Sequence, residues 1–353
     1  MNTFGRILRL TTFGESHGSA VGGVLDGFPA GIDIDMEFVQ AEMRKRRPGL
    51  YVGQSARQEE DKVVFLSGIY KGKSTGTPIS FLIENQDVQS RDYAELEHRF
   101  RPSHADDTYQ QKYGIRDYRG GGRASARETA VRVAGGALAK LMLKPLGVGI
   151  HAYTLRIGTV AIPEDTAVDA LHAYDYVTRC PHKETDIAMQ AVLESLRVQG
   201  DSTGGVIGTV VEGLPAGIGE PLYDKLPARL AAAMLGINAC RGFEIGEGFG
   251  AAEMKGSVHN DRWTANGKTE KNLCGGVRGG ISTGESLRFR TAFKPIATIG
   301  MEQNLLGEDG KLYLSQIKGR HDVCCVPRAV AVVEAMTALV IADFILLARC
   351  NRI

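Results

Sequence analysis

Residues 14–32 read GESHGSAVGGVLDGFPAGI, and residues 200–218 repeat this stretch as GDSTGGVIGTVVEGLPAGI. The two stretches align without a gap, and ten of the nineteen positions are identical. A match of this length at one constant offset indicates an internal duplication. The copies differ where His17 of the first stands opposite Thr203 of the second. A lone loop histidine is usually just solvated, but a titratable group at only one of two equivalent turns makes His17 a candidate functional residue.

A second pair of stretches follows in the same order. Residues 68–81 (GIYKGKSTGTPISF) are similar to residues 276–289 (GVRGGISTGESLRF), and both contain Ser-Thr-Gly. After each comes a polar loop and then a long apolar stretch, 124–143 in the first half and 327–347 in the second. The length and composition of these stretches predict two buried helices.

The predicted fold class is α+β, an internally duplicated β-α-β sandwich with central helices covered by antiparallel sheets. A helix that is apolar all round must be covered on every side, and sheets can supply that cover. Alternating segments at 22–25 and 208–211, bounded by glycine and proline, predict strands of these sheets. We expect a single domain over residues 1–353, with halves of about 1–147 and 195–353 joined by the charged stretch between them.

The composition excludes several classes of protein. Of the 353 residues, 43% are hydrophobic and 24% are charged, as in ordinary globular proteins. A formal net charge of +1 argues against a nucleic-acid binder, which must neutralise many phosphates. The most apolar stretch, 329–348, is interrupted by Glu334 and Asp343, so it predicts a buried helix and not a membrane span.

Compartment and metal content are predicted from the N-terminus and the cysteines. The first ten residues lack the apolar core of a secretory signal, so we expect a cytoplasmic protein. The six cysteines form no C-x-x-C pair. We therefore expect reduced thiols and no metal site.

A glycine run before the first apolar helix is a candidate anion site. Residues 120–122 are all glycine, and Arg123 follows them directly. Ser125 and Glu128 have the spacing of a capping box, which would start the helix at the glycines. Free backbone N–H groups, the helix dipole and Arg123 would then attract an anion. The alternative is a flexible loop before an ordinary helix.

Two more basic clusters lie in the first half. Residues 99–107 (RFRPSHADD) crowd His104 among cations and acids on a loop fixed by proline. An inert position of His104 on the surface is an equally good interpretation of this cluster. Residues 44–47 (RKRR) end an apparent helix, where the dipole alone favours cations, so a solvated helix end is the default interpretation.

The second half carries two further clusters. Residues 294–298 read KPIAT, and residues 319–322 read GRHD just before the second apolar helix. Arg320 and Asp322 could simply form a surface ion pair, which contributes little to stability.

Three long motifs resemble the chorismate synthase family, in order and across essentially the whole chain. They cover residues 14–29, 122–135 and 320–336. Three such patterns are far more specific than one glycine motif. The resemblance implies a lyase that carries out the anti-1,4-elimination of phosphate from 5-enolpyruvylshikimate 3-phosphate, giving chorismate in the last step of the shikimate pathway. It also implies reduced FMN as the cofactor, with no net redox change.

The resemblance assigns roles by position. His17 matches a histidine that assists departure of phosphate, His104 one that protonates reduced flavin, and Asp322 an acid that relays a proton with flavin nitrogen 5. The flavin-contacting positions are Arg123, Ala124, Ser125, Asn238, Ala239, Gly279, Lys294, Pro295, Ile296, Ala297, Thr298 and Arg320. Positions expected to bind the substrate or NADP are Ser16, Arg46, Arg127 and Arg132.

Two positions depart from the family pattern. Val52 stands where a second arginine is usual six residues after Arg46, which weakens the case for NADPH, and Arg57 is the nearest alternative cation. Ser103 replaces the glycine that commonly precedes His104. The resemblance further implies a homotetramer. Because the chain shows no added reductase domain, we expect an external flavin reductase to supply reduced FMN.

Two other functions are alternatives at this point. A non-catalytic flavin carrier would need the glycine-rich anion sites but none of the titratable residues His17, His104 and Asp322. A nucleic-acid-binding module built on residues 44–47 would need aromatic side chains around that run, and they are missing.

Overall fold

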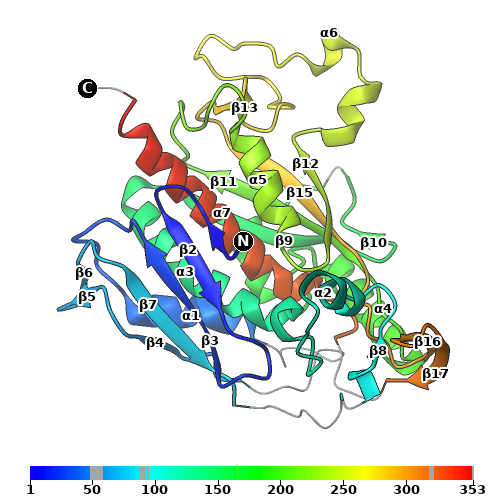
Figure 1. Cartoon of the computed structure of the whole chain (residues 1–353). Coiled ribbons are helices and arrows are strands. Elements are labelled where there is room, and N and C mark those ends of the chain that lie inside the picture. Colours follow the sequence, from blue (N-terminus) through cyan, green and yellow to red (C-terminus); the bar gives the residue numbers. More distant parts are fainter. Residues whose placement is uncertain (48–58, 87–92, 94, 165, 318–321, 352–353) are drawn as a thin grey trace.

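The computed structural model describes residues 1–47, 59–86, 93, 95–164, 166–317 and 322–351. Two five-stranded antiparallel sheets enclose a layer of helices (Figure 1). The mixed fold with antiparallel sheets confirms the predicted α+β class.

The first sheet has the strand order β1-β2-β3-β7-β4 and the second has the order β10-β9-β11-β15-β12. The strands of the first sheet are β1 (Thr3–Phe4), β2 (Arg9–Phe13), β3 (Ala20–Asp26), β7 (Ile79–Glu84) and β4 (Val63–Phe65). Those of the second are β10 (Val160–Ala161), β9 (Gly149–Ile157), β11 (Gly205–Glu212), β15 (Leu287–Phe293) and β12 (Cys240–Ile245). The predicted strand segments lie within β3 and β11.

The two sheets are built in the same order along the chain. In each, two neighbouring strands are followed by a helix, an outer strand, a two-stranded hairpin, the remaining central strand and a long helix. The helices are α1 (Met36–Arg46) and α5 (Leu226–Leu235), then α3 (Thr129–Leu143) and α7 (Val326–Ala348). The hairpins are β5 (Ile69–Tyr70) with β6 (Lys73–Ser74), and β13 (Val277–Arg278) with β14 (Ile281–Ser282).

One repeated glycine has a direct packing reason. A Cβ at Gly22 would lie 2.5 Å from the ring of Phe13, and a Cβ at Gly208 would lie 2.5 Å from the ring of Tyr153. In each case the aromatic residue is paired with the glycine on the adjacent strand. An aromatic ring therefore covers the glycine in both sheets, which no larger residue would allow.

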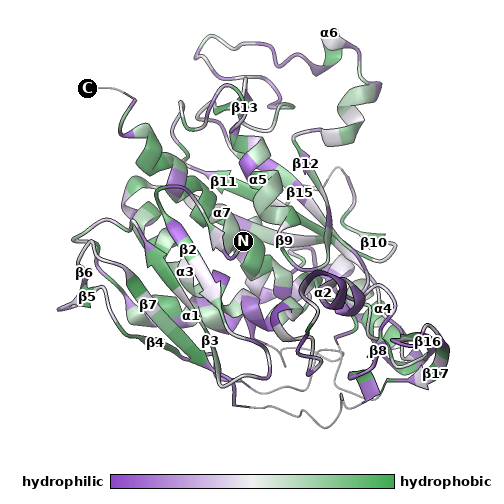
Figure 2. Ribbon diagram, viewed as in Figure 1, coloured by the Kyte–Doolittle hydropathy of each residue, from purple (hydrophilic) through white to green (hydrophobic). Residues whose placement is uncertain are grey.

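Helices α3 and α7 pack against each other in the central layer, and both are strongly hydrophobic (Figure 2). A Cβ at Gly136 of α3 would overlap Ala335 of α7, so glycine lets the two backbones approach closely. Helix α7 is long and apolar enough to cross a membrane, but 89% of its apolar window is buried inside the protein. This confirms the prediction of a buried helix.

The two acids of α7 tie the helix to the two sheets. The carboxylate of Asp343 accepts hydrogen bonds from the backbone N–H groups of Arg6, Ile7 and Leu8 at 2.8–2.9 Å. Glu334 accepts one from the backbone N–H of Ala152 at 3.0 Å and one from Lys140 at 2.7 Å. Buried carboxylates need such partners, so these acids stabilise the helix layer instead of interrupting it.

The predicted start of the first apolar helix is wrong. Two short 3-10 turns, Gly122–Ala124 and Ala126–Glu128, precede α3. Ser125 between them is extended, with ψ of 145°, and its hydroxyl accepts from the N–H of Arg127. Glu128 pairs with Arg132 at 2.8 Å, so the reciprocal capping box does not form.

The stretch between the predicted halves is more than a connection. It contains β9, which pairs with β11 in the second sheet, and helix α4 (Lys183–Gln199). The predicted boundary near residue 195 therefore falls after the first strand of that sheet, and the division into halves stays a prediction.

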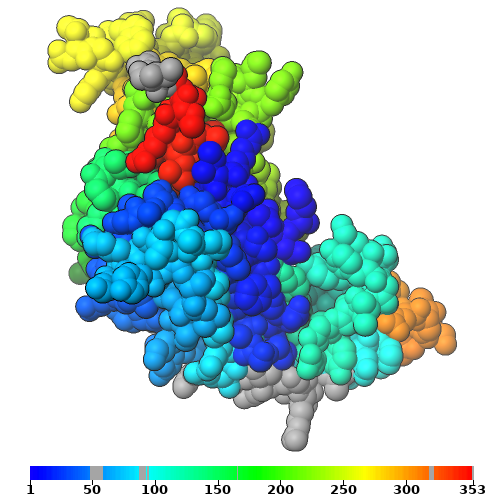
Figure 3. Space-filling model, turned by 60° about the vertical axis from the view of Figure 1, so that its left-hand side comes forward, coloured from blue at the N-terminus to red at the C-terminus, as the bar shows by residue number. Residues whose placement is uncertain are grey.

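A smaller sheet projects from the sandwich. It has the order β17-β16-β8, with β17 (Leu312–Gln316), β16 (Glu302–Gly307) and β8 (Arg99–Phe100). In the space-filling view the β16–β17 hairpin, in orange, forms the right-hand edge of the molecule, and the yellow segment with α6 (Gly256–His259) forms the top (Figure 3). Strand β8 leads into α2 (Asp106–Tyr113), which brings the predicted His104 loop to the sandwich.

Candidate active site

Most of the predicted site residues line one cavity of about 940 Å³. From the predicted set it is lined by Ser16, His17, Arg46, His104, Arg123, Ala124, Ser125, Arg127, Arg132, Asn238, Ala239, Lys294, Pro295, Ile296, Ala297, Thr298 and Asp322. These residues come from both halves of the sequence. Gly279 does not line the cavity and lies in the β13–β14 hairpin. Arg320 lies outside the described residues, as do Val52 and Arg57.

The predicted glycine run forms a turn between the two histidines. Gly120, Gly121 and Gly122 all have positive φ, at 64°, 103° and 53°. A Cβ at Gly120 would overlap His17 Nε2, and a Cβ at Gly121 would lie 3.2 Å from His104 Cε1. Left-handed backbone and close side-chain approach both require glycine here. The turn thus spaces the imidazoles of two loops that are far apart in the sequence.

His17 is held against this turn from one side. Its ring meets the ring of Tyr93 edge-on, with the centroids 5.2 Å apart. The neighbouring Ser16 donates its backbone N–H to Gly122 O at 3.2 Å. The repeat argument predicted a functional position for His17, and the structure places this residue on the cavity wall.

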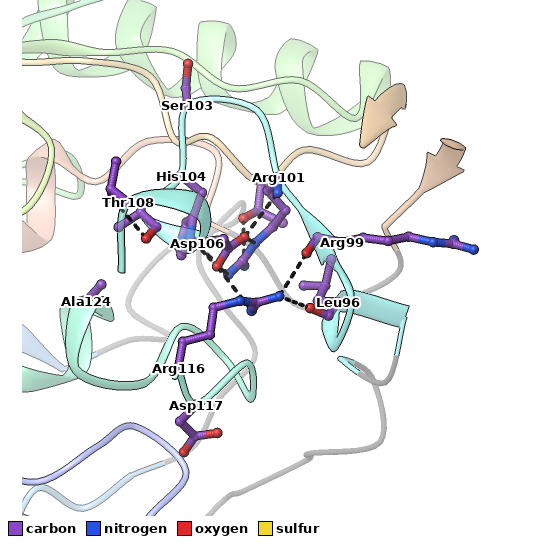
Figure 4. A network of polar contacts seen from close by, with 12 residues as sticks. Leu96, Arg99, Arg101, Ser103, His104, Asp106, Thr108, Arg116, Asp117 and Ala124 are labelled. Atoms are coloured by element: carbon purple, nitrogen blue, oxygen red, sulfur yellow. Dashed lines mark hydrogen bonds and ion pairs between the residues drawn. The ribbon is translucent and has the colours of Figure 1, made fainter. Parts of the chain in front are cut away.

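His104 is held on the other side by two buried charged residues (Figure 4). Its Nδ1 lies 2.9 Å from Asp106 Oδ1 and 3.0 Å from Arg101 Nη2. Arg101 also donates from Nε to Asp106 Oδ2 at 2.8 Å. Burial alone would raise the pKa of the Asp106 carboxyl, but hydrogen bonds from Arg101 and His104 hold this pKa well below its ordinary value. Asp106 is therefore a carboxylate.

The cluster RKRR contributes one residue to the cavity. Arg46 is only 1% exposed, so the solvated helix end is wrong for this residue. Its Nη2 donates to Asp61 Oδ2 at 2.7 Å, and Arg127 Nη1 donates to Asp61 Oδ1. Burial would raise the pKa of Asp61, but Arg46 and Arg127 hold it well below its ordinary value. One buried carboxylate thus fixes two cavity arginines.

Asp322 is linked to the same group of cations. Its Oδ2 accepts a hydrogen bond from Arg328 Nη1 at 2.5 Å, and Arg328 Nε donates to the carbonyl of Arg46 at 3.3 Å. The alternative of a simple ion pair between Asp322 and Arg320 lies outside the described residues. Within them, Asp322 pairs with Arg328, which lies in the first turn of α7.

Two flavin-matching residues have buried polar atoms with no hydrogen-bond partner among the described residues. They are Nη1 of Arg123 and Oδ1 of Asn238. The rest of each side chain is anchored, because Arg123 Nη2 donates to Thr12 O at 2.9 Å and Asn238 Nδ2 donates to Ala124 O at 2.8 Å. A buried donor and a buried acceptor on one cavity wall are suited to a ligand that offers both.

Several cavity residues were not singled out by the sequence analysis. They include Glu59, Tyr93, Arg241 and Arg328 on the cavity wall, and Asp61 behind it. Glu59, Asp61, Tyr93 and Arg241 lie outside the three motifs and reach the cavity through contacts distant in sequence. A useful signal exists only for Arg328, which follows Asp322 by six residues in the first turns of α7.

The fold and the cavity define an enzyme with a cationic site for an anionic ligand. The chain belongs to the chorismate synthase family, whose model, described as chorismate synthase, matches residues 8–346. Members of this family are lyases that eliminate phosphate from 5-enolpyruvylshikimate 3-phosphate to form chorismate at the end of the shikimate pathway. This is the activity of the chain, and it replaces the carrier and nucleic-acid alternatives.

The similarity to individual chorismate synthases extends along the full length of the chain. A chorismate synthase of Phocaeicola vulgatus is 51% identical over 358 residues, covering 100% of this chain and 99% of the relative. One of Porphyromonas gingivalis is 52% identical, covering 100% and 97%. A solved structure described as a crystal structure of chorismate synthase superposes with a TM-score of 0.76 at 31% identity, covering 98% of this chain and 93% of that chain.

Proposed function

We propose that the cavity binds reduced FMN and 5-enolpyruvylshikimate 3-phosphate side by side, and that His17, His104 and Asp322 handle the protons of the elimination. The observation that carries this proposal is the pair of unpartnered buried atoms, Arg123 Nη1 and Asn238 Oδ1, on a wall that also holds residues 294–298. A flavin offers both hydrogen-bond acceptors and donors to such a pair. When bound, reduced FMN would supply electron density as phosphate leaves.

The positive charge of three cavity arginines indicates where the anionic substrate would bind. The substrate carries two carboxylates and a phosphate, and Arg46, Arg127 and Arg132 line the same cavity. Arginine binds such groups through two parallel hydrogen bonds. The carboxylate of Asp61 keeps Arg46 and Arg127 in fixed positions, so little ordering remains when the anion binds.

The proton roles follow from position. His17 lies against the glycine turn, where a protonated imidazole would stabilise a departing phosphate. His104 shares Nδ1 with Asp106, which leaves Nε2 for exchange with the cavity. Asp322 holds its carboxylate against Arg328 and lines the same space. Each group would act as an acid or base within the cavity.

Flavin titration tests the cofactor proposal. Under anaerobic conditions, Arg123→Met and Asn238→Ala should each weaken binding of reduced FMN by about tenfold, since each removes one hydrogen bond worth about 1 kcal/mol or more. Arg197→Met is the matched control, because Arg197 lies on α4 in an exposed ion pair with Glu194. Unchanged flavin affinity in both cavity variants contradicts the assigned position. Absence of chorismate when wild type receives reduced FMN and substrate contradicts the whole proposal.

We further propose a cytoplasmic homotetramer supplied with reduced FMN by an external flavin reductase. The family resemblance supports both the assembly and the external supply of reduced FMN. NADPH binding stays open, since Arg46 lines the cavity but Val52 stands where the family usually has a second arginine. Light scattering checks the assembly, and an NADPH oxidation assay with oxidised FMN checks for a reductase activity, which we expect to be absent.

A further inference from the structure

His104 and the buried Asp106 form a pair whose geometry resembles a general acid–base unit with its orienting carboxylate. The Asp106 side chain is 4% exposed and its Oδ1 lies 2.9 Å from His104 Nδ1. The opposite edge of the ring, with Cε1 and Nε2, faces the Gly121 turn on the cavity side, and a Cβ at Gly121 would lie 3.4 Å from Nε2. The side chain of His104 keeps 19% of its surface exposed.

Two groups compete for His104 Nδ1, and only one of them can set the tautomer. Asp106 can only accept a hydrogen bond, so it requires a proton on Nδ1. Arg101 Nη2, at 3.0 Å, can only donate, so it would require a lone pair on Nδ1. If Nδ1 carried a lone pair, that lone pair would face the carboxylate lone pairs of Oδ1 at 2.9 Å, which is repulsive.

Arg101 resolves the competition by bonding Asp106 instead. It donates to the carboxylate from three nitrogens: the backbone N at 3.1 Å, Nε at 2.8 Å and Nη2 at 2.9 Å. Arg116 adds a second positive charge, with Nη1 3.9 Å from Oδ1. These cations keep Asp106 ionised, so Nδ1 must be the donor.

We propose that Asp106 is a positioning residue for the reaction: it holds a proton on His104 Nδ1, so that Nε2 exchanges the catalytic proton with the cavity. Arg101 has the supporting role of fixing the carboxylate. When Nε2 takes up a proton, the carboxylate stabilises the resulting imidazolium, as in other histidine–carboxylate pairs. This inference rests on the proposed role of His104, while the protonation of His104 itself is a property of the protein without ligands.

The location of the proton can be measured on the wild-type protein. Neutron diffraction from deuterated crystals grown at a pH where the imidazole is neutral should show deuterium on His104 Nδ1 and none on Nε2. Deuterium on Nε2 alone overturns the proposal. This measurement needs neither flavin nor turnover, so it succeeds or fails separately from the proposed function.

A double-mutant cycle tests whether Asp106 acts through His104. Asp106→Asn should reduce turnover by roughly a hundredfold to ten-thousandfold, as loss of an orienting carboxylate does elsewhere. His104→Ala should reduce it as well, and the double variant should be no slower than His104→Ala alone. Asp107→Asn is the matched control, because it removes an acid from the same helix turn and should leave turnover unchanged.

The contrary outcomes are equally definite. If the fold losses of turnover in the two single variants multiply in the double variant, Asp106 acts independently of His104, and the proposal is wrong. If Asp106→Asn loses turnover only because it unfolds, its melting temperature will show this, and the neutron result on wild type then decides. If wild type makes no chorismate with reduced FMN, the proposed function fails. The neutron diffraction measurement still shows which nitrogen of His104 carries the proton.

Discussion

The backbone carbonyl of Ser103 accepts a hydrogen bond from Lys294 Nζ at 2.7 Å, while Ser103 itself has a φ of +57°. Ser103 directly precedes His104, and Lys294 begins the segment 294–298 that also lines the cavity. Residues other than glycine rarely adopt this left-handed backbone. Ser103 stands where the family usually has glycine, so this chain keeps the turn and its contact to Lys294 at the cost of strain.

Replacing Ser103 with glycine should stabilise the protein. The substitution relieves about 1–2 kcal/mol of left-handed strain. It adds about 0.5–1 kcal/mol of chain entropy in the unfolded state. Chemical unfolding should therefore show a gain of up to about 1.5 kcal/mol. Turnover should be unchanged, because the bond to Lys294 uses the backbone carbonyl.

Lys71→Gly provides a comparison for Ser103→Gly. Lys71 also has a positive φ, of 49°, and lies in the exposed β5–β6 turn away from the cavity. It should gain stability in the same way. A loss of stability in Ser103→Gly alone would mean that the serine side chain has a stabilising role.

Gly120→Ala should damage catalysis more than folding. An added Cβ would overlap the ring of His17, so the imidazole must move. Displacement of a catalytic group by about 1 Å costs roughly a hundredfold in rate. Gly114→Ala is the matched control, since Gly114 has a similar φ of 72° but no atom within 4 Å of the added Cβ. The two variants should lose similar stability, measured by thermal unfolding, and only Gly120→Ala should lose turnover.

The sequence predicted the fold through repetition and the site through short motifs. The aligned glycines Gly22 and Gly208 mark the same aromatic-covered position in both sheets, so the repeat carries real packing information. The capping box failed because three successive left-handed glycines and an extended Ser125 replace the first helical turn. Such backbone choices depend on what packs around the turn, here His17 and His104, and no local pattern encodes them.

Residues that act through distant contacts could not be predicted. Asp61 has an ordinary sequence context, yet it joins Arg46 to Arg127, which lies 66 residues after Asp61 in the chain. Its importance arises only when helix α1 and the turn before α3 meet. Asp106 was visible within the RFRPSHADD motif, but its choice of partner depends on the orientation of Arg101.

Asp343→Asn should destabilise the protein strongly. The carboxylate accepts three backbone hydrogen bonds, and an amide would turn an N–H group toward at least one of these donors. Loss of charged hydrogen bonds to buried groups costs about 1.5–3 kcal/mol each. Urea unfolding should therefore show a loss of about 2–4 kcal/mol. Asp33→Asn, in an exposed pair with Lys73, should change stability little. Equal effects in the two variants would contradict the assigned role of Asp343.

Glu42 should contribute stability that depends on pH. Burial would raise its pKa, but Lys140 and Lys45 outweigh burial and lower it below the ordinary value of 4.5. A lowered folded-state pKa means that the contribution is present above pH 4.5 and is lost as pH falls through the folded value. Glu42→Gln should thus cost about 1.5–3 kcal/mol near pH 7.

The pH dependence of that difference is the decisive measurement. Unfolding free energies of wild type and Glu42→Gln should converge as the pH is lowered below 4.5. Glu194→Gln, on the surface of α4, should show little difference at any pH. A constant difference between wild type and Glu42→Gln down to pH 3 would mean that the Glu42 charge contributes no stability.

Asp322 should matter through its ability to exchange a proton. Its carboxylate is bonded to Arg328 at 2.5 Å and lines the cavity, so it could act as a base or could simply orient Arg328. These roles respond differently to amide substitution, because Asn keeps an acceptor oxygen but cannot take up a proton at catalytic pH.

If Asp322 is a base, Asp322→Asn should bind reduced FMN and substrate nearly as well as wild type but turn over roughly a hundredfold to ten-thousandfold more slowly. If it only orients Arg328, Asp322→Asn should keep most activity, and Asp322→Ala should mainly weaken binding. Anaerobic titrations and single-turnover rates for both variants, with Asp309→Asn as an exposed control, separate the two roles, and an active Asn variant eliminates the proton relay.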